Sequence, residues 1–368
     1  MQENKNIVKI VITGGPCAGK TTGMSWIQNA FTQMGYTVLF VPETATELIS
    51  GGVAPWNFKE NIDFQDCLFQ LQLEKERVFY QAAERMDSNK VLIVCDRGIL
   101  DNLAYMSPDE FEHILKNNHL DEVEVRDNYD AVFHLVTAAK GAEEFYTTEN
   151  NTARTETPEQ AAAVDDKIIS AWTGHPHLRV IGNNSDFETK MKKLIKEISS
   201  FLGEPIPLEI ERKYLIEYPD LEWLENEPNC QKIEIIQTYI NGEEGSETRI
   251  RQRGINGHYV YFLTEKKTIS DVQRVEIERR LTRDEYLKLL MKADTTKHQI
   301  RKDRYCLTWD NQYFEIDVYP FWKNKAIMEI ELSDQDDEIN IPSQIKVIRE
   351  VTSEPEYRNA SLAKIHDV

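Results

Sequence analysis

The fold of the first half of the chain follows from the sequence GGPCAGKT at residues 14–21. An apolar run at residues 8–13 precedes it and a helical pattern at residues 21–33 follows it, which is the context of a phosphate-binding loop. In such a loop glycines such as Gly14 and Gly19 let backbone N–H groups approach phosphate oxygens. Lys20 reaches the β- and γ-phosphates, Thr21 offers its hydroxyl to Mg²⁺, and Thr22 joins the nucleotide-binding set. The sequence therefore predicts a site for ATP or GTP.

Short apolar runs alternate with helical patterns as far as Gly203. The runs lie at residues 8–13, 37–41, 91–95, 131–136 and 178–181. Helical patterns lie between or after them, at residues 21–33, 63–85, 158–172 and 186–202. This alternation predicts a parallel sheet with helices around it, an α/β P-loop NTP-binding domain over residues 1–203.

Three more residues of this domain are candidates for its chemistry. Asp96 follows the run at residues 91–95, where a carboxylate can hold Mg²⁺ opposite the phosphate loop. Glu43 follows the run at residues 37–41 and faces the ligand crevice of a parallel sheet, so it could accept a proton from an acceptor hydroxyl; a solvated loop glutamate is the equal alternative. Arg154 precedes a helix and would meet the transferred phosphoryl group from a lid, although arginines in polar loops are usually only solvated.

The pattern changes after a linker, GEPIPL at residues 203–208, because each proline disfavours helix at the residue before it. Beyond the linker, apolar and polar residues alternate with period two at residues 208–215, 233–240, 247–253, 258–266, 275–281, 301–309, 312–318 and 327–332. Turn residues such as Asn256 and Gly257 separate these segments, and a helix is expected at residues 283–293. An antiparallel β domain is therefore predicted over residues 207–368.

Charged residues at alternate positions share one face of each predicted strand. The groups are Glu209/Glu211/Lys213, Arg249/Arg251/Arg253, Glu276/Glu278/Arg280, Lys302/Arg304, Glu315/Asp317 and Glu329/Glu331. A half-exposed sheet sends such charges to water, which is the ordinary explanation of any one strand. Neighbouring like charges are unfavourable, however, unless something of opposite sign lies between them. If this face curls inward, it forms a tunnel with a basic side for polyphosphate and an acidic side for divalent cations.

Two family resemblances follow from these residues. The loop at residues 14–21, the element DRG at residues 96–98 and the string WTGHPH at residues 172–177 resemble the P-loop nucleoside-kinase-like families of AAA type, which include nicotinamide-riboside kinase domains. The signature EIERK at residues 209–213 and the ordered charged groups after it resemble the CYTH, or triphosphate tunnel metalloenzyme, superfamily. The domain order is similar to that of plant relatives that fuse a P-loop kinase-like domain to a CYTH domain.

The second resemblance implies an antiparallel tunnel of eight strands with flanking helices, which requires Mg²⁺ or Mn²⁺ and takes a tri- or diphosphate. It assigns metal binding to Glu209, Glu211, Glu329 and Glu331. It assigns phosphate binding to Lys213, Arg249, Arg251, Lys266, Lys302 and Arg304, with Lys213 also among the catalytic residues. Glu276, Glu278 and Asp317 would complete the acidic side or position a water.

The sequence thus predicts metal-dependent hydrolysis of a phosphoanhydride beside an ATP- or GTP-binding kinase-like domain. The substrate would be inorganic triphosphate, pyrophosphate or a nucleoside or thiamine triphosphate. Two alternatives stay open. One is an adenylyl cyclase, which some CYTH proteins resemble, and the other is a small-molecule kinase whose CYTH domain senses polyphosphate.

The composition of the chain argues against duplex nucleic acid and membranes as partners. With 63 acidic against 43 basic residues and a net charge of −20, the chain lacks the basic surplus with which proteins neutralise duplex nucleic acid. No apolar run approaches the roughly 18 residues needed to span a membrane. The five cysteines are scattered and form no CxxC pair, which indicates reduced thiols in a cytoplasmic protein. The preferred anhydride and the oligomeric state stay open.

Overall fold

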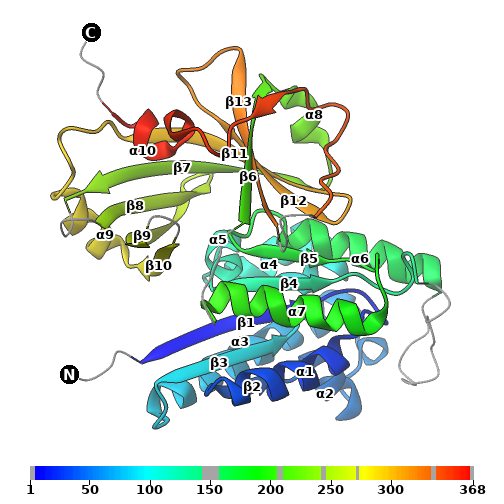
Figure 1. The fold of residues 1–368 in the computed structure, drawn as a ribbon. Coiled ribbons are helices and arrows are strands. Elements are labelled where there is room, and N and C mark those ends of the chain that lie inside the picture. The colour runs from blue at the N-terminus through cyan, green and yellow to red at the C-terminus, as the bar shows by residue number, and fades with distance from the viewer. Residues whose placement is uncertain are drawn as a thin grey trace. The chain divides into compact units, whose positions relative to one another are not determined.

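A computed structural model describes residues 5–142, 157–204, 210–241, 246–270, 273–332 and 337–364, and gives the backbone alone for residues 210, 246, 266–270 and 273–277. The chain divides into two compact units, Met1–Phe201 and Leu202–Val368. Each unit has a β-sheet of its own (Figure 1). Among the described residues, no helix has the length and apolar content to cross a membrane.

The first unit is built on a parallel sheet of five strands in the order β2-β3-β1-β4-β5. The strands are β1 (Asn6–Thr13), β2 (Thr37–Val41), β3 (Lys90–Asp96), β4 (Ala131–Leu135) and β5 (Leu178–Ile181). The predicted α/β architecture with a parallel sheet is therefore confirmed. Parallel strands are covered on both faces and need continuous apolar runs, and Ile10, Val11 and Ile12 of β1 are accordingly fully buried.

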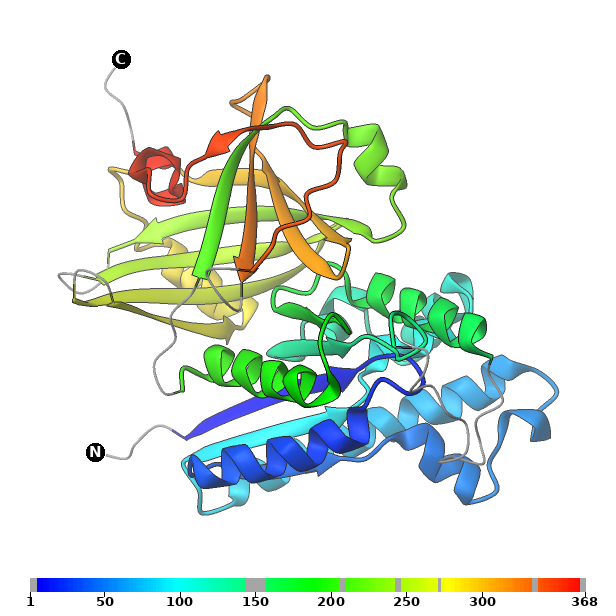
Figure 2. The ribbon, with the colours of Figure 1, turned by 45° about the vertical axis from the view of Figure 1, so that its right-hand side comes forward.

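Helices lie on both faces of this sheet (Figures 1 and 2). They are α1 (Lys20–Gln33), α2 (Thr44–Ser50), α3 (Asn61–Arg85), α4 (Pro108–Asn117), α5 (Glu122–Arg126), α6 (Pro158–Trp172) and α7 (Phe187–Leu202), with the short 3₁₀ helices η1 (Pro55–Asn57) and η2 (Ile99–Ala104). Helix α6 begins with a capping box, in which Thr157 and Gln160 satisfy each other's backbone N–H groups. Its bounds agree with the predicted 158–172.

The second unit holds an antiparallel sheet of nine strands in the order β10-β9-β8-β7-β11-β12-β13-β6-β14. The strands are β6 (Ile210–Glu217), β7 (Cys230–Ile240), β8 (Ser246–Ile255), β9 (His258–Ser270), β10 (Gln273–Leu281), β11 (Ile300–Trp309), β12 (Gln312–Val318), β13 (Lys325–Leu332) and β14 (Val347–Glu350). All eight predicted strands are present, but the number eight is wrong. Strand β14 adds a ninth at the edge of β6, and its four residues are all exposed, so they carry no alternating pattern. Within the described ranges no pairing joins β10 to β14, and tunnel closure stays a prediction.

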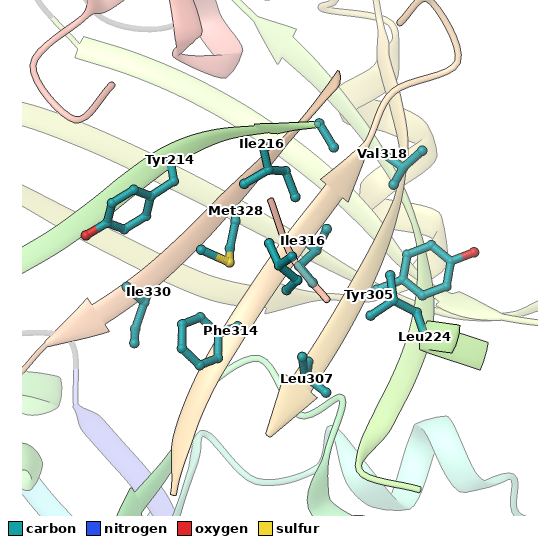
Figure 3. Close-up of a cluster of buried hydrophobic side chains, with 12 residues drawn as sticks. Tyr214, Ile216, Leu224, Tyr305, Leu307, Phe314, Ile316, Val318, Met328 and Ile330 are labelled. Atoms are coloured by element: carbon teal, nitrogen blue, oxygen red, sulfur yellow. The ribbon is translucent and has the colours of Figure 1, made fainter. Parts of the chain in front are cut away.

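One face of this sheet is apolar and covered. Side chains from β6, β11, β12 and β13 pack with Leu224 of α8 (Leu221–Asn226) and with Ile345 (Figure 3). Farther along the sheet, Ile240, Ile250 and Leu263 pack with Tyr286 of α9 (Arg283–Leu290). Successive residues of a strand point to opposite faces, so the residues that alternate with these clusters lie on the other face.

Two local features of the second unit follow from backbone chemistry. Helix α9 ends at Leu290, short of the predicted residue 293, because the N–H groups of Lys292 and Ala293 make i→i−3 bonds to Leu289 and Leu290. The predicted turn at Asn256 and Gly257 joins β8 to β9, with φ of 52° and 89°. Positive φ at both positions is what a two-residue type I′ hairpin requires.

Candidate functional site

The loop between β1 and α1 has a shape that only glycine permits. Gly14 has φ 139°, and a Cβ on it would lie 2.0 Å from the carbonyl oxygen of Leu135. Gly19 has φ 92° at the N-cap of α1, and a Cβ there would lie 2.7 Å from Phe187 Cε2. No side chain caps this helix start, so the first N–H groups of α1 are oriented for an anion.

Lys20 is the cation of this loop. Its Nζ donates to the carbonyl oxygens of Gly14 at 3.0 Å and Gly15 at 3.3 Å. Burial, followed by the charge of Arg97, lowers the pKa of Lys20 to about 8. An incoming phosphate would supply the negative charge that the buried ammonium lacks. Lys20 is therefore placed to bind an anion in front of the loop.

Asp96 ends β3, beside β1 in the sheet. Its Oδ1 is buried without a hydrogen-bond partner among the described residues, and burial raises its pKa. A buried carboxylate oxygen without a partner is unfavourable, and a divalent cation would compensate it. Thr21 and Thr22 lie exposed in the first turn of α1, with the Thr21 hydroxyl available as a second oxygen ligand. The oxygen atoms of Asp96 and Thr21 are of the kind that Mg²⁺ prefers as ligands.

Arg97 connects the phosphate loop to two carboxylates. Its Nε donates to Glu43 Oε1 at 2.5 Å, and its Nη1 donates to the carbonyl oxygen of Gly14 at 3.3 Å. The same Nη1 lies 3.6 Å from Oδ2 of the buried Asp101, which accepts from Thr13 Oγ1 at 2.7 Å. Sequence reasoning quoted Arg97 and Asp101 only as neighbours of Asp96 and gave them no role. Their signal was their position directly after the strand that ends in Asp96.

Glu43 lies at the N-cap of α2 and is partly buried, with 28% of its side chain exposed. Burial alone would raise its pKa, but Arg97 and Lys20 outweigh burial and hold the pKa at about 2. The carboxylate also accepts from Thr46 Oγ1 at 2.6 Å. It is thus a weak base in an ion pair, and neither the solvated alternative nor a poised proton acceptor describes it well.

In the second unit, the strand register places the predicted residues in rows across one face. This face is opposite the two apolar clusters described above, and it also holds smaller groups of apolar side chains, one of them formed by Ile233, Ile235 and Cys306. The rows are Lys213–Glu329–Glu315, Glu211–Glu331, Arg304–Asp317, Arg249–Thr264–Glu278 and Lys266–Glu276. We call it the charged face. The two signs are not segregated into a basic and an acidic side, since Lys213 is the direct partner of Glu329.

Ion pairs connect the charged face across its strands. Lys213 Nζ lies 2.7 Å from Glu329 Oε1, and Arg304 Nη2 lies 3.1 Å from Glu329 Oε2. Asp317 accepts from Arg304 Nε at 2.6 Å and from Lys302. Arg304 also pairs with Glu315, to which sequence reasoning gave no role. On β8 and β10, Arg251 Nη2 lies 2.8 Å from Glu278 Oε2, which also accepts from Thr264 Oγ1 at 2.8 Å.

Three of these charged side chains, Asp317, Lys302 and Arg304, are buried. The exposed fractions are 0% for Asp317, 4% for Lys302 and 7% for Arg304. Burial, and then the neighbouring Arg304, lower the pKa of Lys302. Burial would raise the pKa of Glu329, but Lys213 and Arg304 hold it well below its usual range. The middle of the charged face is therefore buried, with cations and carboxylates in close contact, whereas Glu211 and Glu331 are exposed.

The backbone of Lys213 is fixed from the edge of the sheet. Its N–H donates to Thr352 Oγ1 at 3.0 Å, and its carbonyl oxygen accepts from the N–H of Val351 at 2.8 Å. Both partners follow β14. The ninth strand and the two residues after it thus position the lysine of the EIERK signature.

The donors for a metal in this unit are incomplete among the described residues. Glu211 and Glu331 are direct cross-strand partners of like charge, a pairing that a divalent cation between them would stabilise. Glu329 is already paired with Lys213 and Arg304. No group of three potential ligands comes together in the part of the chain that the structure describes. Arg154 and Glu209 lie outside the described residues, as do the side chains of Lys266 and Glu276.

Comparison with known proteins supports a P-loop domain in the first unit, since residues 9–190 match a family model described as an AAA domain. Among solved structures, an inorganic triphosphatase is 25% identical with a TM-score of 0.31, over 44% of this chain and 97% of that chain. A thymidylate kinase from Ehrlichia chaffeensis is 14% identical with a TM-score of 0.36, over 52% of this chain and 99% of that chain. No curated protein matches the chain. Both TM-scores are low, so the function proposed below depends on the geometry of the two sites.

Proposed function

We propose that the second unit hydrolyses the phosphoanhydride of a small tri- or diphosphate with the help of a divalent metal, Mg²⁺ or Mn²⁺. The observation that carries this proposal is the buried network of Lys213, Glu329, Arg304, Asp317 and Lys302 on the charged face. A face meant only for stability would be apolar, because burying ion pairs is often less stable than packing hydrocarbon. Binding of a charged ligand would explain why these charged side chains are buried here.

The cations of the charged face would bind the substrate by exchanging partners. Lys213, Arg251 and Arg304 now contact carboxylates. A polyphosphate entering the face offers the same cations stronger, doubly charged acceptors. Glu211 and Glu331, with Glu209 and Glu329, would hold the metal, which supplies charge neutralisation and polarisation of the phosphoryl oxygens. Lysine and arginine side chains would then stabilise the charge that develops on the phosphoryl group.

The carboxylates would orient these cations and the attacking water. Glu278 is fixed by Arg251 and Thr264 and keeps 17% of its side chain exposed. It is thus better placed to reach water than Asp317, which is fully buried and engaged by two cations. We assign Asp317 to holding Lys302 and Arg304, and Glu278 to contact with the reacting end.

For the first unit we propose an ATP- or GTP-binding, kinase-like activity. Lys20 and the glycine loop would bind the phosphates, while Thr21 and Asp96 would hold Mg²⁺. Glu43 would keep Arg97 directed at the loop through their ion pair. We do not assign it the role of proton acceptor, because its pKa of about 2 makes it a weak base. The acceptor that receives the phosphoryl group is left open by these residues.

The test is a phosphate-release assay on the full chain with Mg²⁺ and Mn²⁺. Inorganic triphosphate, pyrophosphate, nucleoside triphosphates and thiamine triphosphate are each offered at neutral and alkaline pH. We expect release from at least one of them, and release from none would overturn the hydrolase. Cyclic AMP from ATP would indicate a cyclase instead, and tight binding without turnover would indicate a sensor. Lys20→Ala should abolish the activity of the first unit and leave hydrolysis of the preferred anhydride by the second unit intact.

A further inference from the structure

The buried carboxylate of Asp165 on α6 contacts the phosphate loop. Its Oδ1 accepts from the backbone N–H of Gly15 at 2.8 Å, although 150 residues separate the two. The same oxygen accepts from Thr137 N at 3.2 Å and lies 3.0 Å from His134 Nε2, while Oδ2 accepts from Lys140 Nζ at 3.0 Å. Asp165 is fully buried, so these contacts are its whole environment of hydrogen-bond donors among the described residues.

The donors around Asp165 favour its ionised form. Burial alone would raise its pKa, but His134, Lys140 and the N–H of Gly15 hold the pKa well below its usual range. His134 is itself fully buried, and its Nδ1 has no partner in the described part of the chain. Nε2 of this ring faces the carboxylate, which can only accept, so Nε2 is the nitrogen that donates to Asp165 Oδ1. The carboxylate is thus a permanent acceptor beside the loop.

The bond from Gly15 to Asp165 also sets the direction of the Gly14 carbonyl group, which belongs to the same peptide unit. In a trans peptide the N–H of one residue and the C=O of the residue before it point in opposite directions. Because the N–H of Gly15 is directed at Asp165, the C=O of Gly14 is directed away from it. That carbonyl oxygen accepts from Lys20 Nζ at 3.0 Å and from Arg97 Nη1 at 3.3 Å. One peptide plane therefore connects the carboxylate to both cations of the site.

A second contact two helical turns later fixes the same helix to the other side of the site. Trp172 Nε1 donates to Asp101 Oδ1 at 2.6 Å, and Asp101 is the buried carboxylate beside Arg97. A Cβ on Gly98 would lie 2.6 Å from Trp172 Cζ2, so the ring packs directly on the backbone after Arg97. Helix α6 thus touches the phosphate loop through Asp165 and the residues after β3 through Trp172.

We propose that Asp165 is a positioning residue for nucleotide binding, which orients the Gly14–Gly15 peptide and thereby Lys20 and Arg97. The proposal rests on nucleotide binding by the first unit. Asp165 touches no phosphate itself. Its effect reaches the ligand through the loop, so its loss should weaken nucleotide affinity rather than remove a ligand contact.

The experiment compares Asp165→Ala, Asp165→Asn and Asp166→Ala in the full chain. Asp166 is the matched control, because it accepts from Lys140 Nζ at 2.6 Å but is exposed and makes no hydrogen bond to the loop within the described residues. Binding of ATP and GTP is measured by calorimetry below the unfolding temperature of each variant. We expect Asp165→Ala to weaken binding about 10-fold or more, since one charge-assisted bond is lost. Asp165→Asn, which keeps an oxygen in place, should fall between Ala and the wild type, and Asp166→Ala should match the wild type.

A purely structural role would lower the unfolding temperature of Asp165→Ala and leave the affinity of the folded protein unchanged, which would overturn the proposal. Circular dichroism and the unfolding temperature report whether each variant is folded. Amide exchange in the wild type tests the bond without any substitution. The Gly15 amide should exchange as slowly as core amides with and without nucleotide, and fast exchange would overturn the proposal even if Asp165→Ala fails to fold. A wild type that binds neither nucleotide would instead overturn the function of the first unit, and this role with it.

Discussion

Lys213 and Glu329 are direct partners across strands β6 and β13, and Lys213 Nζ lies 2.7 Å from Glu329 Oε1. Burial would lower the pKa of this lysine, but Glu329 and Glu211 outweigh burial and raise it. The ammonium is therefore charged over the whole neutral range. It is held by a carboxylate that a phosphate can replace.

Lys213→Ala should reduce kcat/KM for the preferred anhydride by about 100-fold, because a charged contact to the developing phosphoryl charge is lost. Lys346→Ala is the matched control, since this lysine lies 75% exposed and 3.7 Å from Glu217. Initial rates of phosphate release measure both. A Lys213→Ala protein as active as Lys346→Ala would remove this residue from the proposed machinery.

Lys302→Met and Asp317→Asn should separate stability from activity. Lys302→Met removes a buried cation of lowered pKa and leaves the Arg304–Asp317 pair, so we expect a stability equal to or above that of the wild type. Asp317→Asn leaves the buried Lys302 without its carboxylate partner and Arg304 with only Glu315 and Glu329, and should cost about 3–5 kcal/mol. Urea unfolding of each variant measures the difference. Both variants should hydrolyse the substrate more slowly, and a fully active Lys302→Met would contradict the role given to the charged face.

Asp96→Asn should uncouple nucleotide binding from magnesium. The neutral amide cannot replace the carboxylate as a ligand, so we expect at least about 100-fold slower turnover in the first unit and little change in metal-free nucleotide affinity. Asp87→Asn, at an exposed position, serves as the control. Titration of ATP with and without Mg²⁺ shows the difference. If Mg²⁺ strengthens binding equally in both variants, Asp96 is not a metal ligand.

Nucleotide affinity should fall as the pH rises through about 8, because the pKa of Lys20 is lowered to about 8 and the neutral amine no longer attracts phosphate. The effect on stability has the opposite direction. Since the folded pKa lies below the ordinary 10.5, the unfolded chain binds more protons between those two values, and the free energy of unfolding of the unliganded unit rises with pH there. Calorimetric affinities from pH 6.5 to 9.5 test the first statement. A flat profile would show that Lys20 does not titrate in the free protein.

Much of the fold could be predicted because strand and helix periods are local. The alternation at residues 312–318 fixed β12 to the residue, and the motif at residues 14–21 located the glycine loop. Strand β14 escaped because its four exposed residues carry no pattern. A period-two pattern also determines which residues share a face, so the charged face was predicted without its strand order.

The partners within the sites could not be predicted in the same way. Lys213 meets Glu329 only because β6 pairs with β13, and sequence spacing contains no information on that neighbour. The expectation of separate basic and acidic sides failed for this reason. Asp165 was not identified at all, since nothing near it in the sequence indicates that α6 brings it to Gly15.

The bonds from Val351 and Thr352 to the backbone of Lys213 make the second unit sensitive to a single break in its chain. A protease cut between Ile339 and Gln344, before β14, would leave every residue of the charged face on the larger fragment. The cut would, however, detach β14, Val351 and Thr352, which hold the backbone of Lys213. Limited digestion should then abolish hydrolysis when the short fragment dissociates, although every charged group of the face is still present. A protein whose short fragment stays bound after the cut should keep its activity.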